Sequence, residues 1–530
     1  MFRRVFIGGA VAIAVLALLA SQLTPPSVPR IVTFRQGRNN TVLFLTNCEH
    51  GLSNVFVATA YTLLERHPEV EVHYASFPSI APKLKRISER ARQKQPSTRG
   101  VIYHEAPDIN FLVAMLKSSR APRNVVHPPG RAGLDWITQD MPLYTSPWSG
   151  EDHMTLFHKF SDIIDEVDPS LVVLDAFLRP AIDAARNSSR LHAFISPLTP
   201  IEVFPLEQPY GGWLWKYPVM GSGIPYPVPW TKLLENLYIN VRYFYAMLRM
   251  PHYTAVQKYL VSKGLANRVS WFSLRNDAVP WITQALPGAS TPLDVLPRNV
   301  TLAGPIILSP APAAEQDSEL AAWLTRAPTV LINLGSLVVW SEAQLDAMAR
   351  ALADTLLVRP DLQILWKFTK ASSQSGVKGT EASGDDFMTR LLPFVETGRL
   401  RIQSWLEIQP VSLLETGHIV ASVHHGGAGC YSEALGTGVP QIVLPQWLDH
   451  YSFAQLAQDI GVGVWGCRDA SPFWTPDCLR DAFSTVLLRS ESGDRIRKTA
   501  RGFGEIVQRD PGQHVAAREV AKLAASGYGP

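Results

Sequence analysis

The sequence predicts an α/β protein in which parallel β-sheets are covered by helices. With 530 residues the chain is too long for one ordinary domain, and two or three domains are expected. From residue 41 onward, short apolar runs of strand type alternate with segments of helical periodicity, the pattern typical of parallel sheets. A stretch with six prolines, 287–312, has the composition of a linker between two such domains.

The first domain is expected to open with a strand, a helix and a second strand. The apolar run 41–46 is followed by a helix at 53–67, in which Val57 and Tyr61 share one face, and by a strand at 71–76. Such a βαβ opening predicts a parallel sheet with right-handed crossovers. Further strands of this domain are expected at 101–104, 171–175 and 192–196.

The second domain repeats this alternation. It is expected to begin near Trp323, and the residues after Ala500 are polar and of helical type. A strand at 330–334 ends in Gly335-Ser336, and further strands are expected at 364–368, 400–403, 418–423 and 440–444.

The stretch from His424 to His450, HHGGAGCYSEALGTGVPQIVLPQWLDH, has the features of an anion site. A β-branched strand ends in two histidines, a glycine turn follows, and helix-compatible residues begin at Cys430. This order leaves backbone N–H groups free at a helix N-terminus, where a phosphate can bind. Glycines allow the backbone to approach such a group, because no Cβ intervenes. The second strand ends before Asp449-His450, at the sheet edge where α/β proteins bind ligands.

The segment Trp405 to His450 resembles the donor-binding signature of the family 1 UDP-glycosyltransferases. The likeness is closest to fungal members, which often carry HHGGAG where plant enzymes have a Cys-Gly-Trp-Asn version. The resemblance implies the GT-B fold, in which two Rossmann-like domains face a cleft. The division we expect is an N-terminal anchor and linker at 1–40, an acceptor-binding domain at 41–290, a UDP-sugar-binding domain at 291–500 and a C-terminal helical segment at 501–530. The resemblance implies that this last segment crosses back to the first domain.

The resemblance also implies which residues hold the donor, a UDP-sugar that acts as co-substrate, with no separate cofactor. Trp405 would stack on uracil, and Glu433 would accept the ribose hydroxyls, unless it is only a carboxylate favoured by the start of a helix. Asp449 and His450 would face the sugar. The diphosphate would contact Ser336, His425, Gly426, Gly427, Gly429 and Cys430. Cys430 departs from the Ser or Thr of many relatives, and a thiol is a weak hydrogen-bond donor.

His50 and Asp175 are the expected catalytic residues. His50 lies in the loop after the first strand, and imidazole can remove a hydroxyl proton near neutral pH without special tuning. Asp175 ends an apolar strand and would fix the tautomer of that imidazole. In the family, the base histidine and its aspartate occupy matching places. The alternatives are a histidine that caps the next helix and an aspartate that caps the segment after Pro180.

The reaction implied by the resemblance is inverting transfer of a hexose, glucose being expected, to a hydroxyl of a small lipophilic acceptor. A sterol, terpenoid, polyketide or other secondary metabolite would fit. The segment 201–253 interrupts the strand–helix alternation and is rich in Pro, Gly and aromatic residues, as functional loops often are. We expect it to line the acceptor site through Trp213, Trp215 or Trp230. The alternative is that these aromatic residues are ordinary core or a patch that rests on a membrane. Two rival functions are a UDP-sugar epimerase or hydrolase and a catalytically silent, membrane-anchored binding partner.

Charge and cysteine content exclude other classes of site. A net charge of +3 without a basic stripe gives no indication of nucleic-acid binding. The cysteines Cys48, Cys430, Cys467 and Cys478 lack the spacing of zinc ligands, and no other cluster suggests a metal. Cys467 and Cys478 are close enough in sequence to pair, but two free buried thiols are the favoured interpretation.

The N-terminus carries an apolar run from Val5 to Ala20, preceded by Arg3-Arg4. Its length lies between a signal-peptide core and a transmembrane helix, and we favour an uncleaved hydrophobic anchor over a cleaved signal. The protein is therefore expected at a membrane, that of the endoplasmic reticulum. Arginines on both sides of the run do not decide which side the domains face. Sequons that would permit a lumenal glycoprotein begin at Asn39, Asn187 and Asn299.

Overall fold

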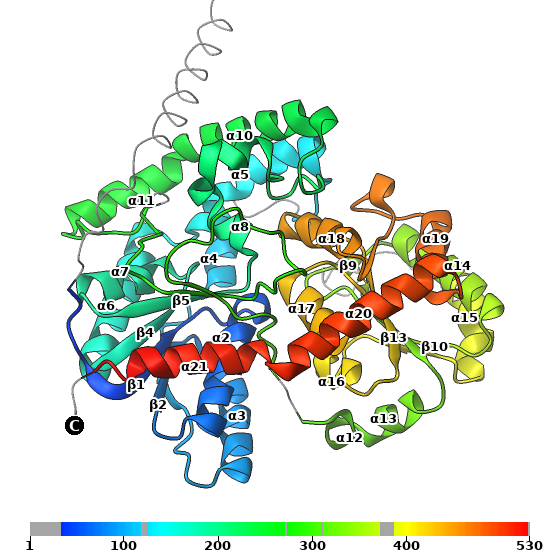
Figure 1. Cartoon of the computed structure of the whole chain (residues 1–530), viewed down its shortest axis with the longest axis horizontal. Helices are drawn as coiled ribbons and strands as arrows, with labels where there is room; N and C mark the ends of the chain where they lie inside the picture. The colour runs from blue at the N-terminus through cyan, green and yellow to red at the C-terminus, as the bar shows by residue number, and fades with distance from the viewer. Residues whose placement is uncertain (1–32, 118–124, 271–272, 309–310, 371–385, 528–530) are drawn as a thin grey trace, which may run out of the picture.

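The structure is a computed structural model that describes residues 33–117, 125–270, 273–308, 311–370 and 386–527. Two large parallel sheets lie side by side, one in each half of the chain (Figure 1). The α/β class and the two Rossmann-like domains expected from the sequence are therefore confirmed.

The first sheet has seven strands in the order β3-β2-β1-β4-β5-β6-β7. Its central strands are continuous apolar runs, because helices cover both faces and keep both from water. Thus β4 is buried along its whole length. The strands are β1 (Arg38–Leu45), β2 (Glu71–Ser76), β3 (Ile102–Glu105), β4 (Pro169–Asp175), β5 (His192–Ser196), β6 (Trp281–Thr283) and β7 (Val300–Leu302).

Helices pack on both faces of this sheet and extend from its carboxyl edge. The main ones are α2 (His50–Arg66), α3 (Ala81–Lys94), α4 (Phe111–Lys117), α5 (Leu134–Thr145), α6 (Gly150–Val167), α7 (Arg179–Asn187), α10 (Leu233–Leu248) and α11 (Pro251–Ser262). The segment 201–253, expected to be loop, contains two short helices, α8 (Pro200–Val203) and α9 (Gly212–Trp215), and the whole of α10, so that expectation is wrong over 233–248.

The boundary between the domains lies later than expected. β7, at Val300–Leu302, pairs in parallel with β6 and forms the edge of the first sheet. A boundary at residue 290 is therefore wrong, because the prolines mark the connection between two strands of one sheet and not only the exit from it.

The second sheet has six strands in the order β12-β10-β8-β13-β14-β15. They are β8 (Thr329–Asn333), β10 (Gln363–Lys367), β12 (Leu400–Gln403), β13 (Ile419–His424), β14 (Gln441–Val443) and β15 (Gly463–Trp465). The accompanying helices are α12 (Ala313–Gln316), α13 (Ser318–Leu324), α14 (Glu342–Val358), α15 (Asp386–Glu396), α16 (Pro410–Leu414), α17 (Ala428–Thr437), α18 (Asp449–Asp459) and α19 (Pro476–Leu487). A separate pair of short strands comprises β9 (Val339–Trp340) and β11 (Thr369–Lys370).

The last two helices join the domains. α20 (Glu491–Arg509) packs on α17 of the second domain, and α21 (Gly512–Ala524) packs on α2, β1 and β4 of the first (Figure 1). Near the end of α21, the Ser170 hydroxyl donates to the carbonyl oxygen of Ala524 at 2.7 Å. The chain therefore returns to its first domain, as the resemblance implied.

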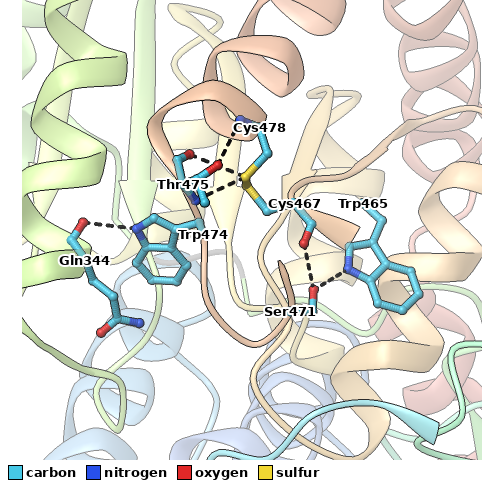
Figure 2. Close-up of a disulfide and its surroundings, with 7 residues drawn as sticks. All are labelled: Gln344, Trp465, Cys467, Ser471, Trp474, Thr475 and Cys478. Atoms are coloured by element: carbon cyan, nitrogen blue, oxygen red, sulfur yellow. Dashed lines mark hydrogen bonds between the residues drawn. A yellow bond between two sulfur atoms is a disulfide. The ribbon is translucent and has the colours of Figure 1, made fainter. Parts of the chain in front are cut away.

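Cys467 and Cys478 form a disulfide, so the expectation of two free thiols is wrong. Cys467 follows β15 and Cys478 lies in the first turn of α19, and a tight loop brings their Cα atoms to 5.0 Å. Trp465 and Trp474 flank this loop (Figure 2). The Trp465 Nε1–H donates to the Ser471 hydroxyl at 2.9 Å, and Trp474 Nε1–H to the carbonyl oxygen of Gln344 at 3.0 Å.

The predicted anchor, Val5 to Ala20, lies outside the described residues. Among the residues that are described, no helix combines the length and the apolar character needed to cross a bilayer.

Candidate active site

A cavity of about 2890 Å³ lies between the two domains. Its walls contain the loops after β1, β4 and β5 of the first sheet and those after β8, β12, β13 and β14 of the second, together with the end of β10. The carboxyl ends of strands from both sheets therefore face one space, where α/β proteins place their ligands.

The glycine turn after β13 is shaped by close contacts that only glycine allows. Gly426 has a φ of +88°, and a Cβ there would lie 2.8 Å from the carbonyl oxygen of His450. A Cβ at Gly427 would lie 2.8 Å from His425 Nε2, and one at Gly335 would lie 3.0 Å from His425 Cε1. The His425 ring therefore fits between two backbone segments that lack side chains.

This turn leads directly into α17, whose first N–H groups have no partner within the helix. Gly427 is the N-cap residue, and a Cβ added at Gly429 would meet no atom within 4 Å. The backbone is therefore open to a ligand at the positive end of the helix dipole. The Cys430 sulfur lies 3.9 Å from His425 Nδ1.

The two adjacent histidines differ in role. His424 is buried, accepts the Gly426 N–H at Nδ1 and donates from Nε2 to the Gln441 side chain at 2.9 Å, so it supports the turn. His425 lines the cavity. Burial, with His424 and Lys367 nearby, lowers its pKa to about 3, so it is a neutral imidazole that can donate one hydrogen bond.

Lys367 is a cavity residue that the sequence analysis missed. It is the last residue of β10, it is only 4% exposed, and its ammonium donates to the carbonyl oxygen of Gly335 at 2.7 Å. The ammonium also lies 5.4 Å from the centre of the Trp405 ring. Burial lowers its pKa. A lysine that ends an otherwise apolar strand at a carboxyl edge was the available signal.

Trp405 and Glu433 both lie on the second-domain side of the cavity. Trp405 lines the cavity with 57% of its surface exposed, so its ring face is accessible to a base. Glu433 also lines the cavity, and because α17 begins at Ala428 it lies in the second turn of that helix. A favourable place at the helix start therefore does not explain this carboxylate.

The Glu433 carboxyl faces a cation from the other domain. Burial raises its pKa to about 7, and Lys83 of α3 acts in the opposite direction. Lys83 is itself buried, hydrogen-bonded to the Asn54 side chain, and its pKa is lowered to about 8 by burial. These two side chains connect the domains electrostatically on this side of the cavity.

Asp449 meets a second carboxylate across the cavity. Burial and the nearby Glu202 raise its pKa to about 7. Glu202, in α8 of the first domain, accepts the Thr199 N–H through one oxygen, whereas the other is enclosed and has no hydrogen bond within the described structure. His450 also borders the cavity but is only 3% exposed, with its ring 4.2 Å from that of Trp447 and 4.5 Å from that of His425.

His127, from the first domain, forms hydrogen bonds with the loop before α18. Its Nε2 accepts the Leu448 N–H at 3.1 Å while its Nδ1–H donates to the carbonyl oxygen of Pro128 at 2.9 Å. Its backbone N–H donates to the carbonyl oxygen of Gln446, and the Tyr451 hydroxyl donates to its carbonyl oxygen. These contacts fix the segment that carries Asp449 against the first domain.

His50 is the first residue of α2, follows the N-cap Glu49, and is exposed on the wall of the cavity. Desolvation of the imidazole by the cavity wall, together with the positive charges of Lys83 and Arg86, lowers the pKa of His50. At neutral pH its imidazole is therefore predominantly neutral and able to accept a proton. It is not the N-cap residue of its helix, which removes that alternative.

The hydrogen bonds of Asp175 in the described structure go to Asn47 and Phe177 and not to His50. One carboxylate oxygen accepts the Asn47 side-chain N–H at 2.9 Å, and the other accepts the Phe177 N–H at 2.9 Å. The expected hydrogen bond to His50 is absent from the described residues, because Asn47 occupies that side of the carboxylate. Asp175 is also not the cap of α7, whose N-cap residue is Leu178. It therefore fixes the chain three residues before His50.

The first-domain side of the cavity is largely apolar and aromatic. Trp213 lines it, but Trp215 and Trp230 do not, so these two expected acceptor contacts are wrong. Residues two apart on a helix point to opposite sides, which turns Trp215 away from Trp213. Trp230 lies on the outer surface at 86% exposure. Other apolar lining residues are Met115, Ile137, Met141, Phe204, Tyr243, Phe244 and Met247.

Comparison with known proteins identifies the family. Residues 398–500 match the model of the erythromycin biosynthesis protein CIII-like C-terminal domain. The chain is 32% identical over 509 residues to the glycosyltransferase sdnJ of Sordaria araneosa, covering 91% of this chain and 98% of that one. The chain belongs to the family 1 UDP-glycosyltransferases.

Further relatives of this UDP-glycosyltransferase are more distant. A sterol 3-beta-glucosyltransferase of Leptosphaeria maculans is 27% identical over 237 residues, covering 43% of this chain and 14% of that protein. A UDP-glucosyltransferase from Polygonum tinctorium shares the fold with a TM-score of 0.60 at 16% identity, covering 93% of this chain and 100% of that one. UGT2 of Phytolacca americana, solved with UDP-2-fluoroglucose and pterostilbene, gives 0.56 at 15% identity, covering 92% and 100%. The GT-B fold and the enzyme class expected from the signature are thus confirmed.

Proposed function

We propose that the protein transfers a hexose, glucose being expected, from a UDP-sugar to a hydroxyl of a small lipophilic acceptor, with inversion at the anomeric carbon. The observation that supports this most is the single cavity, which joins His50 and an apolar wall on one side to the glycine turn and Trp405 on the other. Relatives named as sterol and phloretin glucosyltransferases fit the same choice of sugar and acceptor.

In the proposed reaction, the acceptor oxygen bonds to the anomeric carbon as the bond from that carbon to the UDP oxygen breaks. The electron pair of the broken bond leaves with UDP, and His50 takes the acceptor proton. General-base help of this kind contributes about 10²–10⁴ in rate. Asp175 is a positioning residue that acts through Asn47, because its carboxylate fixes the turn that carries His50.

The departing diphosphate gains negative charge, which the second domain would stabilise through preorganised donors. The N–H groups at the start of α17 and the Lys367 ammonium would serve as such donors. Neutral His425 would add one N–H, Ser336 a hydroxyl, and the weak Cys430 thiol little. Trp405 would stack on uracil, Glu433 would accept the ribose hydroxyls, and Asp449 would accept hydroxyls of the sugar with His450 behind it.

A UDP-release assay tests the proposal. The full chain is incubated with UDP-glucose and a panel of hydroxylated lipophilic compounds, and then with other UDP-sugars and the best acceptor. Release that depends on an acceptor, with a β-linked product from an α-linked donor, is expected. Equal release without any acceptor would indicate a hydrolase or epimerase, and no release from any UDP-sugar would indicate a silent binding partner.

The apolar run Val5–Ala20 would hold these domains at the membrane of the endoplasmic reticulum, where lipophilic acceptors partition. Fractionation of cells that express the full chain tests this location. Recovery in the soluble fraction without alkali or detergent would contradict it.

A further inference from the structure

The outer side of α10 exposes a stripe of large apolar and aromatic side chains. Leu234, Tyr238, Tyr245 and Leu248 are separated by four, seven and three residues, so they share one face of the helix. Their exposed fractions are 80%, 39%, 45% and 61%, and Trp230, just before the helix, is 86% exposed. Contiguous exposed apolar residues of this size typically mark an interaction site. We call these five residues the α10 outer face.

The opposite side of α10 belongs to the active-site cavity. The cavity is lined by Asn240, Tyr243, Phe244 and Met247. Asn236, on the same side of the helix, is fully buried. The helix thus separates the acceptor cavity from the outer face, and it runs along the rim of the first domain (Figure 1). Among the described residues, the side chains of the outer face are left largely uncovered.

Basic side chains border the stripe. Arg131 and Arg242 lie 5.2 and 5.8 Å from the centre of the Tyr238 ring, and Arg249 lies 4.7 Å from that of Tyr245. Lys232 completes the group. Lys232 pairs with Glu235, and Arg242 pairs with Asp135. Because the group has four cations and these two carboxylates, the border of the apolar face carries a net positive charge.

We propose that the α10 outer face docks on an anionic phospholipid bilayer. Trp and Tyr side chains favour the boundary between acyl chains and headgroups, and arginine and lysine can extend toward phosphates while their stems cover apolar surface. A symmetric second copy fits less well, because a two-fold contact would bring the same cations against one another. The docking holds the acceptor cavity one helix away from the lipid and stands independently of the proposed chemistry.

Site-specific fluorescence tests the docking in the full chain. Leu234→Cys is labelled with an environment-sensitive fluorophore, and Leu357→Cys, on the exposed side of α14 at 71% exposure, is the matched control. On vesicles of phosphatidylcholine and phosphatidylinositol, we expect a blue shift and quenching by brominated acyl chains at position 234 and neither change at 357. No change at 234, equal changes at both, or a shift at 234 that rises with protein concentration without lipid would overturn the proposal; the last would assign the face to a second copy.

A triple substitution links docking to turnover. Trp230→Ser, Leu234→Ser and Leu248→Ser together change only exposed side chains, so the fold should persist. We expect a loss of turnover on an acceptor embedded in vesicles and unchanged kcat/KM on a dissolved acceptor. Loss on the dissolved acceptor alone would place the face in the active site and overturn the assignment. Failure of the unmodified enzyme on every acceptor would concern the proposed function instead, and the fluorescence result would be unaffected.

A different observation indicates which compartment the domains occupy. The Cys467–Cys478 disulfide is of a kind that persists in oxidising compartments such as the lumen of the endoplasmic reticulum. Of the three sequons, Asn187 is exposed at the end of α7, whereas the Asn299 side chain donates to the carbonyl oxygen of Asp277 and Asn39 has an enclosed side-chain oxygen. The geometry points to a lumenal enzyme that carries an N-linked glycan on Asn187.

Glycosidase treatment of the full chain from a eukaryotic membrane fraction tests this assignment. We expect one increase in mobility on removal of N-glycans, lost in Asn187→Gln and retained in Asn299→Gln. In parallel, Cys467 and Cys478 should react with a maleimide only after reduction and unfolding. A chain whose mobility does not change, or one whose change survives Asn187→Gln and disappears in Asn299→Gln, would overturn the glycan assignment. Reaction of both thiols without reductant would overturn the lumenal location.

Discussion

In the second domain, the largest group of cavity residues comes from one continuous stretch, 425–450, and its glycine turn is fixed by backbone contacts. Gly426 and Gly427 allow approaches that a Cβ would block, and the N–H groups of α17 follow at once. In the first domain, the cavity wall is assembled from the loops after β1 and β4 and from separate helices such as α5 and α10. The donor side is therefore specified by backbone geometry, and the acceptor side by the packing of distant side chains.

This difference suggests how substitutions should act. Changes in the second domain should affect UDP-sugar binding and departure whichever acceptor is used. Changes on the first-domain wall should depend on the acceptor, except at the base. The largest effect is expected at the base, His50, which is the one exception to this division.

His50→Ala should lower kcat by about 10²–10⁴, because the acceptor proton would lack a base. The affinity for UDP, measured by calorimetry, should change little, since the residue lies across the cavity from the glycine turn. His67→Ala, at the other end of α2, is the matched control and should leave kcat unaltered. Normal turnover of His50→Ala would remove this residue from the mechanism.

Lys367→Met should weaken UDP binding and lower kcat/KM by about 10–100-fold, as expected for the loss of a hydrogen bond from a charged group. The loss should be similar for every acceptor, because the ammonium lies on the donor side. Arg350→Met, at an exposed cation on α14, provides the comparison. A loss that varies strongly among acceptors would break the proposed division between the domains.

Glu433→Gln should raise the donor KM more than it lowers kcat, since a ribose contact is present in both ground and transition states. Burial raises the pKa of this carboxyl in the folded protein to about 7, above its ordinary value of 4.5, so ionisation opposes folding. The penalty is absent below pH 4.5, grows as pH rises, and is complete above pH 7. The substitution should therefore stabilise the unliganded protein at pH 8, by up to about 3 kcal/mol, and have little effect near pH 4.

Thermal unfolding at both pH values checks this sign, with Glu342→Gln, an exposed first-turn glutamate of α14, as the control. The donor KM of the unmodified enzyme should also rise as pH falls from 8 to 6, because a protonated carboxyl accepts hydroxyl hydrogen bonds less well. A stabilising effect without any change in donor KM would leave Glu433 buried for a reason other than ribose binding.

The two sides of the cavity also differ in how far the sequence could predict them. His425, Glu433 and Asp449 belong to one stretch whose local pattern determines its conformation, and all three line the cavity. Lys367 was missed because it joins them only through the pairing of β10 with β8. The disulfide was missed for a similar reason, since its loop closes only once β15 and α19 have packed.

Errors on the first-domain side have a common physical origin. An aromatic-rich segment indicates a special region, but it does not reveal which side of a short helix each ring occupies, so Trp213 and Trp215 looked equivalent. In the same way, an aspartate at the end of a strand predicts a buried carboxylate that accepts hydrogen bonds, but the sequence does not show which residue donates them. Asn47, whose side-chain N–H donates to Asp175 at 2.9 Å, takes that place.

The smallest expected effect is the sharpest test of the acceptor wall. Trp213→Ala removes an aromatic side chain from the cavity, whereas Trp215→Ala removes one that is half exposed outside it. Trp213→Ala should raise the acceptor KM about 3–30-fold, because the acceptor would lose part of its apolar contact with the wall, at roughly 25 cal/mol per Å². The size should vary with the bulk of the acceptor, and UDP affinity should stay constant. Trp215→Ala should leave both quantities near those of the unmodified enzyme. If instead Trp215→Ala changes acceptor kinetics and Trp213→Ala does not, the acceptor binds outside the cavity described. The acceptor side would then not be the wall of packed side chains that we contrast with the donor side.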